Sequence, residues 1–285
     1  MSLFQITIGF LLLASWVARP FLYKPAAKYF KPEISSLFTS CWLLVGLAVT
    51  FPFLGHLLEF KGQNVLFSPY ILISIYKGVT LFYLISMQQA INKNSTSSSV
   101  FLGFIALALG ALVNNLFFHE NLGLVKVVCI VCFGVLGFLF LQKGDAKRLS
   151  RKDLYYFIIV AVIMASYTVA DHLAIPRVGW YAHLLVSSVA MFLTSIIYKS
   201  SKDSLKVIFT NKTIIIAGIF YTLSEFFVIY ASFNILPVSI VAVFLRLSTP
   251  IIMVISAVKY KEQDIKNQLG FGLAAIILAL PIILG

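Results

Sequence analysis

Ten long apolar segments, joined by short polar connections, run through this sequence of 285 residues. A run of about 20 apolar residues is long enough to cross the hydrocarbon core of a bilayer as an α-helix. Inside lipid every backbone N–H and C=O group must be bonded within the protein, which a helix achieves on its own. The sequence therefore predicts an all-α membrane protein with ten transmembrane helices, at residues 3–22, 36–55, 70–91, 97–118, 122–141, 154–174, 180–198, 213–233, 235–258 and 268–284.

The composition excludes the main classes of soluble protein. Hydrophobic residues make up 60% of the chain and charged residues 11%, whereas soluble domains carry roughly 45–50% apolar and about 25% charged residues. So few charges cannot cover a water-facing surface, which excludes a soluble enzyme, a disordered chain and a secreted disulfide scaffold. The net charge of +12 comes mostly from the connections. We interpret it as a signal of membrane topology, and we expect no nucleic-acid partner.

The two halves of the chain carry short matches to each other. The tripeptide at 14–16 and the one at 165–167 are both Ala-Ser followed by an aromatic residue, and each is followed at the same distance by a proline. Matches at a slightly different offset pair Asn92 with Asn234 and Glu120 with Glu262. A repeat unit with an odd number of helices, here five, ends on the opposite side of the membrane from where it begins, so the second copy enters the membrane from that opposite side. The sequence predicts two inverted five-helix repeats, 1–142 and 154–285, joined by the basic connecting loop 143–153.

A further pattern lies around Trp16 and in the segments 99–120 and 241–262. In the second of these segments Pro250 lies partway along the apolar run and a Lys-Glu pair follows, whereas the first lacks the proline and ends in His-Glu. With its length and number of spans, the chain resembles the EamA-type transporters of the drug/metabolite transporter superfamily. That resemblance implies ten helices around a central cavity, lined by the helix that carries Arg246, and secondary transport of a small organic metabolite.

Basic residues are distributed unevenly over the connections. Seventeen lysines and arginines lie in or beside the connections after odd-numbered segments, and three lie in or beside those after even-numbered segments. By the positive-inside rule, the side with seventeen faces the cytoplasm, which places both termini on the opposite face. The resemblance implies cytoplasmic termini instead, so the two arguments disagree. We expect a multi-pass integral protein of the cell inner or plasma membrane, surrounded by membrane lipids, in the orientation that the charges favour.

Three predicted segments carry a charge near the middle: Lys77, Glu225 and Arg246. A charge at the centre of a membrane helix costs about 2.5–3.5 kcal/mol on insertion, so it usually faces a protein interior or a wet cavity. We interpret the three as substrate-binding residues of one site with a net charge of about +1, where Arg246 suits a carboxylate or phosphate and Glu225 an ammonium group or a coupling proton. The alternative is structural: Lys77 snorkels or pairs with an acid, Glu225 pairs with Lys77 or Arg246, and Arg246 bonds to helix ends.

Aromatic side chains on the same segments are predicted to wall this site. Tyr76 and Tyr83 flank the lysine of the third segment, and Tyr221 shares a helical face with the glutamate of the eighth. Trp16 and its repeat equivalent Tyr167 would contribute one wall from each half. The alternative, for Trp16 above all, is an aromatic belt at the membrane interface.

Several polar residues near these positions receive no role in substrate binding. Arg19 shares a face of the first segment with Trp16, and Asp171 shares a face of the sixth with Tyr167. The four histidines are expected to face the membrane interface: His56, His119, His172 and His183.

These features predict a transporter and no enzyme, because the chain has no HExxH, GxSxG, P-loop or dinucleotide motif. The expected substrate is an amino acid or a similar amphipathic zwitterion, moved by alternating access of the two inverted repeats. Coupling to a proton at Glu225, exchange and uncoupled transport are the alternatives. No cofactor or metal is expected, and a monomer and a homodimer fit equally well. Other functions considered are an exchanger of phosphorylated metabolites, a multi-span enzyme acting on lipid-linked substrates and a membrane scaffold.

Overall fold

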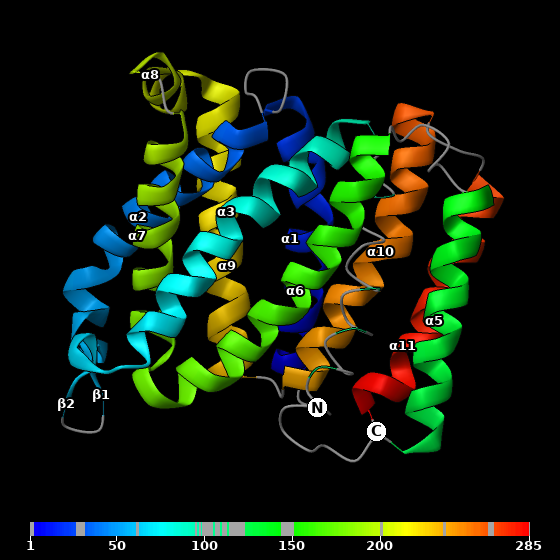
Figure 1. The fold of residues 1–285 in the computed structure, drawn as a ribbon, viewed down its shortest axis with the longest axis horizontal. Helices are drawn as coiled ribbons and strands as arrows, with labels where there is room; N and C mark the ends of the chain where they lie inside the picture. Colours follow the sequence, from blue (N-terminus) through cyan, green and yellow to red (C-terminus); the bar gives the residue numbers. More distant parts are fainter. Residues whose placement is uncertain are drawn as a thin grey trace.

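The computed structural model of the chain is a bundle of long helices (Figure 1). It describes residues 3–26, 32–60, 63–94, 96, 98, 105, 109, 113, 123–143, 151–199, 202–235, 238–261 and 265–284. The long helices are α1 (Leu3–Ala26), α2 (Pro32–Leu54), α3 (Ile71–Asn94), α5 (Leu124–Lys143), α6 (Arg151–Val178), α7 (Trp180–Lys199), α9 (Lys212–Asn234), α10 (Val238–Tyr260) and α11 (Ile265–Leu284). Each predicted apolar segment coincides with one of them, except 97–118, most of which lies outside the described residues.

The helices indicate a membrane protein. Within the described ranges, six are long and apolar enough to cross a bilayer: α1, α2, α3, α6, α7 and α9. Shorter apolar stretches of the same kind lie within α5, α10 and α11. Large hydrophobic side chains such as Phe53, Leu72 and Ile197 are exposed on the outer surface, where lipid rather than water would surround them.

Short elements connect the long helices at both ends of the bundle. Between α2 and α3 the chain forms η1 (Gly55–Leu58), an antiparallel pair of two-residue strands, β1 (Glu59–Phe60) and β2 (Gln63–Asn64), and η2 (Val65–Phe67). The short helix α8 (Lys202–Thr210) precedes α9, whose N-terminus is capped by Asn211. The Asn211 side chain accepts hydrogen bonds from the backbone N–H groups of Thr213 and Ile214, which would otherwise lack partners at a helix start.

A single glycine separates α6 from α7. Gly179 has a φ of 77°, in the left-handed region that glycine adopts without strain. Its N–H donates to the carbonyl of Ile175 at 2.9 Å, and its own carbonyl accepts from the N–H of His183 at 3.2 Å. The chain therefore turns back within one residue, and both helices pack against α3.

The long helices form an unbroken series of contacts (Figure 1). Helix α3 packs against α2, α6 and α7, and α2 also contacts α7 and α9. Helix α1 lies in the middle of the bundle and contacts α9 on one side and α10 on the other. Helix α11 packs against both α10 and α5, which lies at the edge of the bundle.

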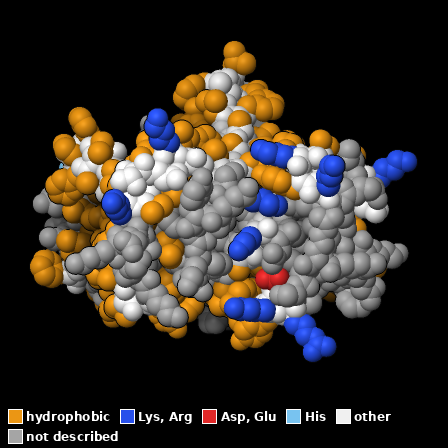
Figure 2. Space-filling model, turned by 90° about the horizontal axis from the view of Figure 1, so that it is seen from above, with side chains coloured by type: hydrophobic (Ala, Val, Ile, Leu, Met, Phe, Trp, Pro, Cys, Tyr) orange, Lys and Arg blue, Asp and Glu red, His pale blue; other side chains and the backbone are white. Residues whose placement is uncertain are grey.

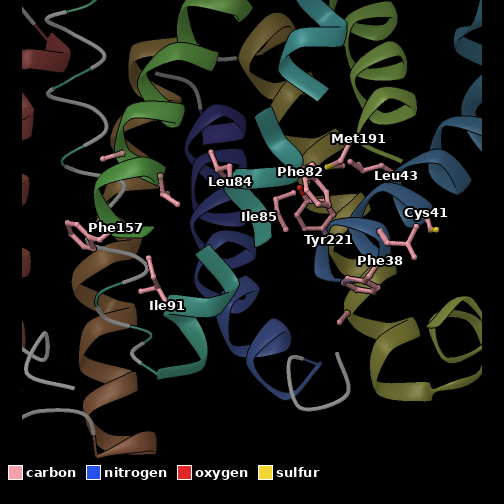
Figure 3. Close-up of a cluster of buried hydrophobic side chains, with 14 of the residues drawn as sticks. Phe38, Cys41, Leu43, Phe82, Leu84, Ile85, Ile91, Phe157, Met191 and Tyr221 are labelled. Atoms are coloured by element: carbon pink, nitrogen blue, oxygen red, sulfur yellow. The ribbon is translucent and has the colours of Figure 1, made fainter. Parts of the chain in front are cut away.

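Buried apolar side chains fill the interior between these helices. Phe38 of α2, Phe82 of α3, Phe157 of α6 and Met191 of α7 belong to one buried cluster, together with Tyr221 of α9 (Figure 3). This cluster joins helices of the first half of the chain to helices of the second.

Lysine and arginine side chains gather at one end of the bundle, the end shown uppermost in Figure 1 and face-on in Figure 2. Lys24 and Lys93 end their helices there, and Arg151, Lys152 and Lys212 begin theirs. The start of α1 and the end of α11 both lie at the opposite end (Figure 1). We call the end of the bundle where these lysines and arginines gather the basic end.

The contact between α3 and α7 depends on Gly78. A β-carbon at this position would overlap the backbone oxygen of Ser187 and lie 2.6 Å from the β-carbon of Ala190. We expect Gly78→Ala to lower the free energy of unfolding by roughly 1–3 kcal/mol, because one helix must move away from the other. Thermal unfolding of the purified protein in detergent measures the effect. Gly134→Ala in α5 is the control, since a β-carbon there meets nothing within 4 Å, and equal melting temperatures of the two variants would contradict this packing.

Candidate functional site

Among the residues that the structure describes, the ion pairs within the bundle form two clusters, and each joins the first half of the chain to the second. In one cluster α1 meets α9, and in the other α3 meets α6 and α7. Charges in a membrane interior are costly unless opposite charges or hydrogen bonds compensate them, and they commonly mark sites of function. The two clusters are therefore the candidate functional sites.

Arg19 of α1 and Glu225 of α9 form the first ion pair. Arg19 Nη2 lies 2.5 Å from Glu225 Oε1, and the two side chains are 19% and 20% exposed. The guanidinium carbon of Arg19 is 4.5 Å from the ring centre of Trp16 and 4.0 Å from that of Tyr221. We call these four residues the arginine cluster.

Helical spacing places these side chains together. Trp16 and Arg19 are three residues apart on α1, and Tyr221 and Glu225 are four apart on α9, so each pair shares one helical face. A planar guanidinium stacks on aromatic rings while its edge binds a carboxylate. The cluster thus offers one cation and one anion between apolar rings, which matches the chemistry of an amphipathic zwitterion.

The second cluster is centred on one carboxylate oxygen. Lys77 of α3 forms an ion pair with Oδ1 of Asp171 in α6. The same oxygen lies 2.8 Å from Nε2 of His183 in α7, and the other ring nitrogen, Nδ1, lies 2.7 Å from Ser74 Oγ. Ser74 and His183 are fully buried, whereas the side chains of Lys77 and Asp171 are 15% and 29% exposed. We call these four residues the histidine cluster.

The carboxylate determines the direction of the hydrogen bonds. A carboxylate only accepts, so Nε2 of His183 carries a proton and donates it to Asp171. The Nδ1 of a neutral imidazole is then an acceptor and receives the hydroxyl proton of Ser74. With Lys77 positive, Asp171 negative and His183 neutral, the cluster carries no net charge.

The row of Ser74, His183 and Asp171 has the residue types of a hydrolase triad, but its geometry does not support that chemistry. A nucleophilic serine needs an oxygen that the substrate can reach, and Ser74 has no exposed surface. The aspartate of a triad serves its histidine, whereas Asp171 is shared with Lys77. In the described part of the chain, no three histidine, cysteine, aspartate or glutamate side chains are grouped to hold a metal ion.

Two of the predicted tyrosines line cavities outside these clusters. Tyr83 lines a cavity of about 420 Å³ between α3, α6 and α7, together with Lys93 and Lys152 of the basic end. The hydroxyl of Tyr76 donates to Ser166 at 3.2 Å, and both residues border an apolar cavity of about 400 Å³ between α3 and α6. Trp16 and Tyr221 belong to the arginine cluster, whereas Tyr83 and Tyr76 line these cavities, so the predicted aromatic walls are distributed over several places.

The structure does not bring Lys77 and Glu225 into one site. Lys77 pairs with Asp171, and the partner of Glu225 is Arg19. Each predicted charge is thus neutralised by a different residue, and neither pair has the net positive charge expected for the joint site. The side chains of Arg246 and Tyr167 lie outside the described residues, so their part in substrate binding stays a prediction.

Sequence reasoning gave no substrate-binding role to four residues of the clusters: Arg19, Ser74, Asp171 and His183. The expectation that His183 faces the membrane interface is wrong, because its side chain is 2% exposed and bonded on both ring nitrogens. Arg19 and Asp171 lie within three residues of the ends of their predicted segments, where a charge usually marks the interface. The helices, however, extend to Ala26 and Val178, beyond those ends. If the predicted segments had been extended by one helical turn at these ends, both charges would have been placed inside the membrane.

Comparisons with known proteins leave the chain without an assigned relative. No protein-family model matches it, and a search of the curated proteins finds no match either. The resemblance to EamA-type transporters therefore stays a prediction, and the argument for function rests on the geometry of the two clusters.

Proposed function

We propose that this protein is a secondary transporter of the EamA type that moves a small organic zwitterion, such as an amino acid, across a cell membrane. Transport would occur by alternating access of two inverted repeats, and the arginine cluster is the substrate site. The observation that carries the proposal is the ion pair between Arg19 and Glu225, held between aromatic rings at the junction of the two halves.

Without substrate, the charges of Arg19 and Glu225 compensate each other in the arginine cluster. A zwitterion carries one charge of each sign, so it can replace each residue as the partner of the other. A substrate carboxylate would bind the guanidinium of Arg19, and a substrate ammonium group would bind the carboxylate of Glu225. Neither protein charge would be left uncompensated at any stage of this exchange, which keeps its electrostatic cost small. The rings of Trp16 and Tyr221 would contact the apolar part of the substrate.

The contacts between helices support an inverted repeat. An inverted repeat would make α1 equivalent to α6, α2 to α7, α3 to α9 and α5 to α11. Under this equivalence, the contact of α1 with α9 corresponds to that of α6 with α3, and the contact of α3 with α7 corresponds to that of α9 with α2. The contacts of α2 with α7 and of α5 with α11 each join two helices that are equivalent to one another. A glycine lies in each of the two equivalent contacts α3–α7 and α9–α2: Gly78 packs against α7, and Gly218 packs against α2. Such relations are expected of two related five-helix units.

The distribution of charge supports an orientation. The basic end would face the cytoplasm by the positive-inside rule, and the start of α1 and the end of α11 would face away from it. In that orientation, the cavity beside Lys93 and Lys152 opens on the cytoplasmic side.

Uptake into liposomes tests the proposal. The purified protein is reconstituted, loaded with one unlabelled L-amino acid at a time, and supplied outside with the same amino acid in radiolabelled form. We expect counterflow of at least one amino acid, because exchange needs only the two orientations of a loaded site. Protein-free liposomes are the control, and absence of counterflow for every amino acid would contradict the proposal.

The cavity that Tyr83 lines favours a second candidate, an exchanger of phosphorylated metabolites. Lys93 and Lys152 supply two cations beside the carboxylate of Asp153, and Tyr156 and Tyr198 supply aromatic surface, in a space of about 420 Å³. These groups suit a phosphate ester with an apolar or heterocyclic body. Counterflow of sugar phosphates or nucleotides that amino acids do not inhibit would select this candidate over the first.

A further inference from the structure

We propose that the histidine cluster binds the coupling proton of transport: His183 takes up one proton, and this uptake loosens the ion pair between Lys77 and Asp171. The inference rests on the proposed transport function and places the coupling ion away from the substrate. It assigns the proton to a site other than Glu225, which the structure pairs with Arg19.

The argument starts from one shared oxygen. Lys77 Nζ and His183 Nε2 both bind Oδ1 of Asp171. In the neutral cluster this sharing is favourable, because one donor is charged and the other is not. When the imidazole becomes cationic, two positive charges compete for one carboxylate oxygen and repel each other. The buried imidazole is fixed on both sides, so the displaced group is Lys77, whose long side chain is flexible.

The proton balance of this step is simple. One proton from water binds Nδ1 of His183, and the Ser74 hydroxyl turns from donor to acceptor of the new N–H. The Nε2–H bond to Asp171 is kept. The net charge of the cluster changes from zero to +1, and release of the proton reverses each change. Histidine suits this task because its neutral and cationic forms differ by one proton, and its surroundings determine the pH at which that proton binds.

In the described residues around His183, the charged groups that face its ring are those of the histidine cluster. Helix α7 packs against α2, α3, α6 and η1. Helix α3 contributes Ser74 and Lys77 and α6 contributes Asp171, while the described side chains of α2 include no charged group. The element η1 carries His56, which is exposed, and Arg177 of α6 lies over the ring of Tyr70.

The position of the cluster connects proton uptake to movement. Lys77 and Ser74 belong to the first half of the chain, and Asp171 and His183 belong to the second. An ion pair that joins the halves restrains their relative motion, so its weakening favours the change of orientation that alternating access requires. The side chain of Asp171 is 29% exposed, which gives the shared carboxylate contact with its surroundings.

Histidine NMR tests proton binding without any transport. The protein is labelled with ¹⁵N-histidine, reconstituted in lipid and titrated between roughly pH 4 and pH 8, and His183→Asn identifies the His183 signals. We expect the His183 signals to change from those of a neutral tautomer to those of an imidazolium within this range. Signals that stay neutral throughout would overturn the proposed proton site.

Transport in liposomes tests coupling. The probes are radiolabelled L-amino acids, assayed singly with a pH gradient and, separately, by counterflow without one. We expect the wild type to accumulate roughly tenfold or more amino acid with the pH gradient than without it, and His183→Asn to accumulate the same amount in both conditions. His183→Gln is a second variant in case the first does not fold, and His56→Asn, at an exposed histidine, is the control.

The outcomes separate this inference from the proposed function. Equal gradient-driven accumulation by His183→Asn and the wild type would overturn the coupling site and leave the transport function standing. A wild type that exchanges amino acids without responding to a gradient would do the same. A wild type that moves no amino acid would overturn the proposed function and the coupling with it, while the NMR titration would still decide proton binding by His183.

Discussion

For the transport function proposed here, replacement of Arg19 by alanine is expected to reduce kcat/KM for amino-acid uptake by roughly 100-fold or more, because the substrate carboxylate would lose its cation and Glu225 its compensating charge. Removal of one partner from a desolvated, hydrogen-bonded charge pair typically costs about 2–5 kcal/mol. The effect should be largest in kcat/KM measured by initial rates of uptake in liposomes that contain equal amounts of protein.

Two further variants separate substrate binding from folding in this experiment. Arg19→Lys keeps the charge but loses the planar fork and the stacking on Trp16 and Tyr221, so we expect a smaller loss of uptake. Arg177→Ala is the matched control, since Arg177 also lies over a tyrosine ring, at 5.4 Å from that of Tyr70, but on a different helix. Uptake by Arg19→Ala equal to that of the Arg177→Ala variant would remove the arginine cluster from the substrate site.

Replacement of Lys77 by methionine is expected to lower the free energy of unfolding by roughly 2–3 kcal/mol. The change leaves the carboxylate of Asp171 without its cation in the interior of the bundle. Removal of one partner from a fully buried pair costs about 3–5 kcal/mol, and the 29% exposure of Asp171 reduces that cost. Thermal or denaturant-induced unfolding in detergent measures the effect.

The double variant Lys77→Met with Asp171→Asn decides whether the loss comes from the unpaired charge. We expect it to regain most of the stability, because the amide that replaces the carboxylate carries no charge and its oxygen can still accept from His183. Lys212→Met, at an exposed lysine where α9 begins, is the control and should unfold like the wild type. Single and double variants of equal stability would show that the ion pair contributes through packing alone.

Hydropathy was sufficient to predict the helices but less accurate at their ends. The predicted segments 3–22 and 154–174 correspond to α1 and α6, which extend four residues further, to Ala26 and Val178. A segment defined by hydropathy ends where charges begin, whereas a helix ends where its backbone bonding ends. Side chains as long as that of Arg19 can enter the membrane interior from such a terminal turn. The same limitation excluded Asp171 from the predicted intramembrane charges.

The pairing of charges could not be predicted, because it depends on which helices are neighbours. Lys77 and Asp171 are 94 residues apart in sequence, and no local pattern indicates that α3 packs between α6 and α7. The sequence identified Lys77 and Glu225 as unusual and predicted a common site for them. Their different partners follow from the contacts of α3 with α6 and of α1 with α9, which arise from packing of the entire bundle.

Both ion pairs draw their cation from the first half of the chain, as Arg19 and Lys77, and their acid from the second half, as Glu225 and Asp171. Of these four residues, two copies of the first half would bring together only cations, and two copies of the second half would bring together only acids. These charges favour association of the two different halves over association of two like halves. We therefore expect separately synthesised fragments of the two halves to assemble with each other rather than with themselves.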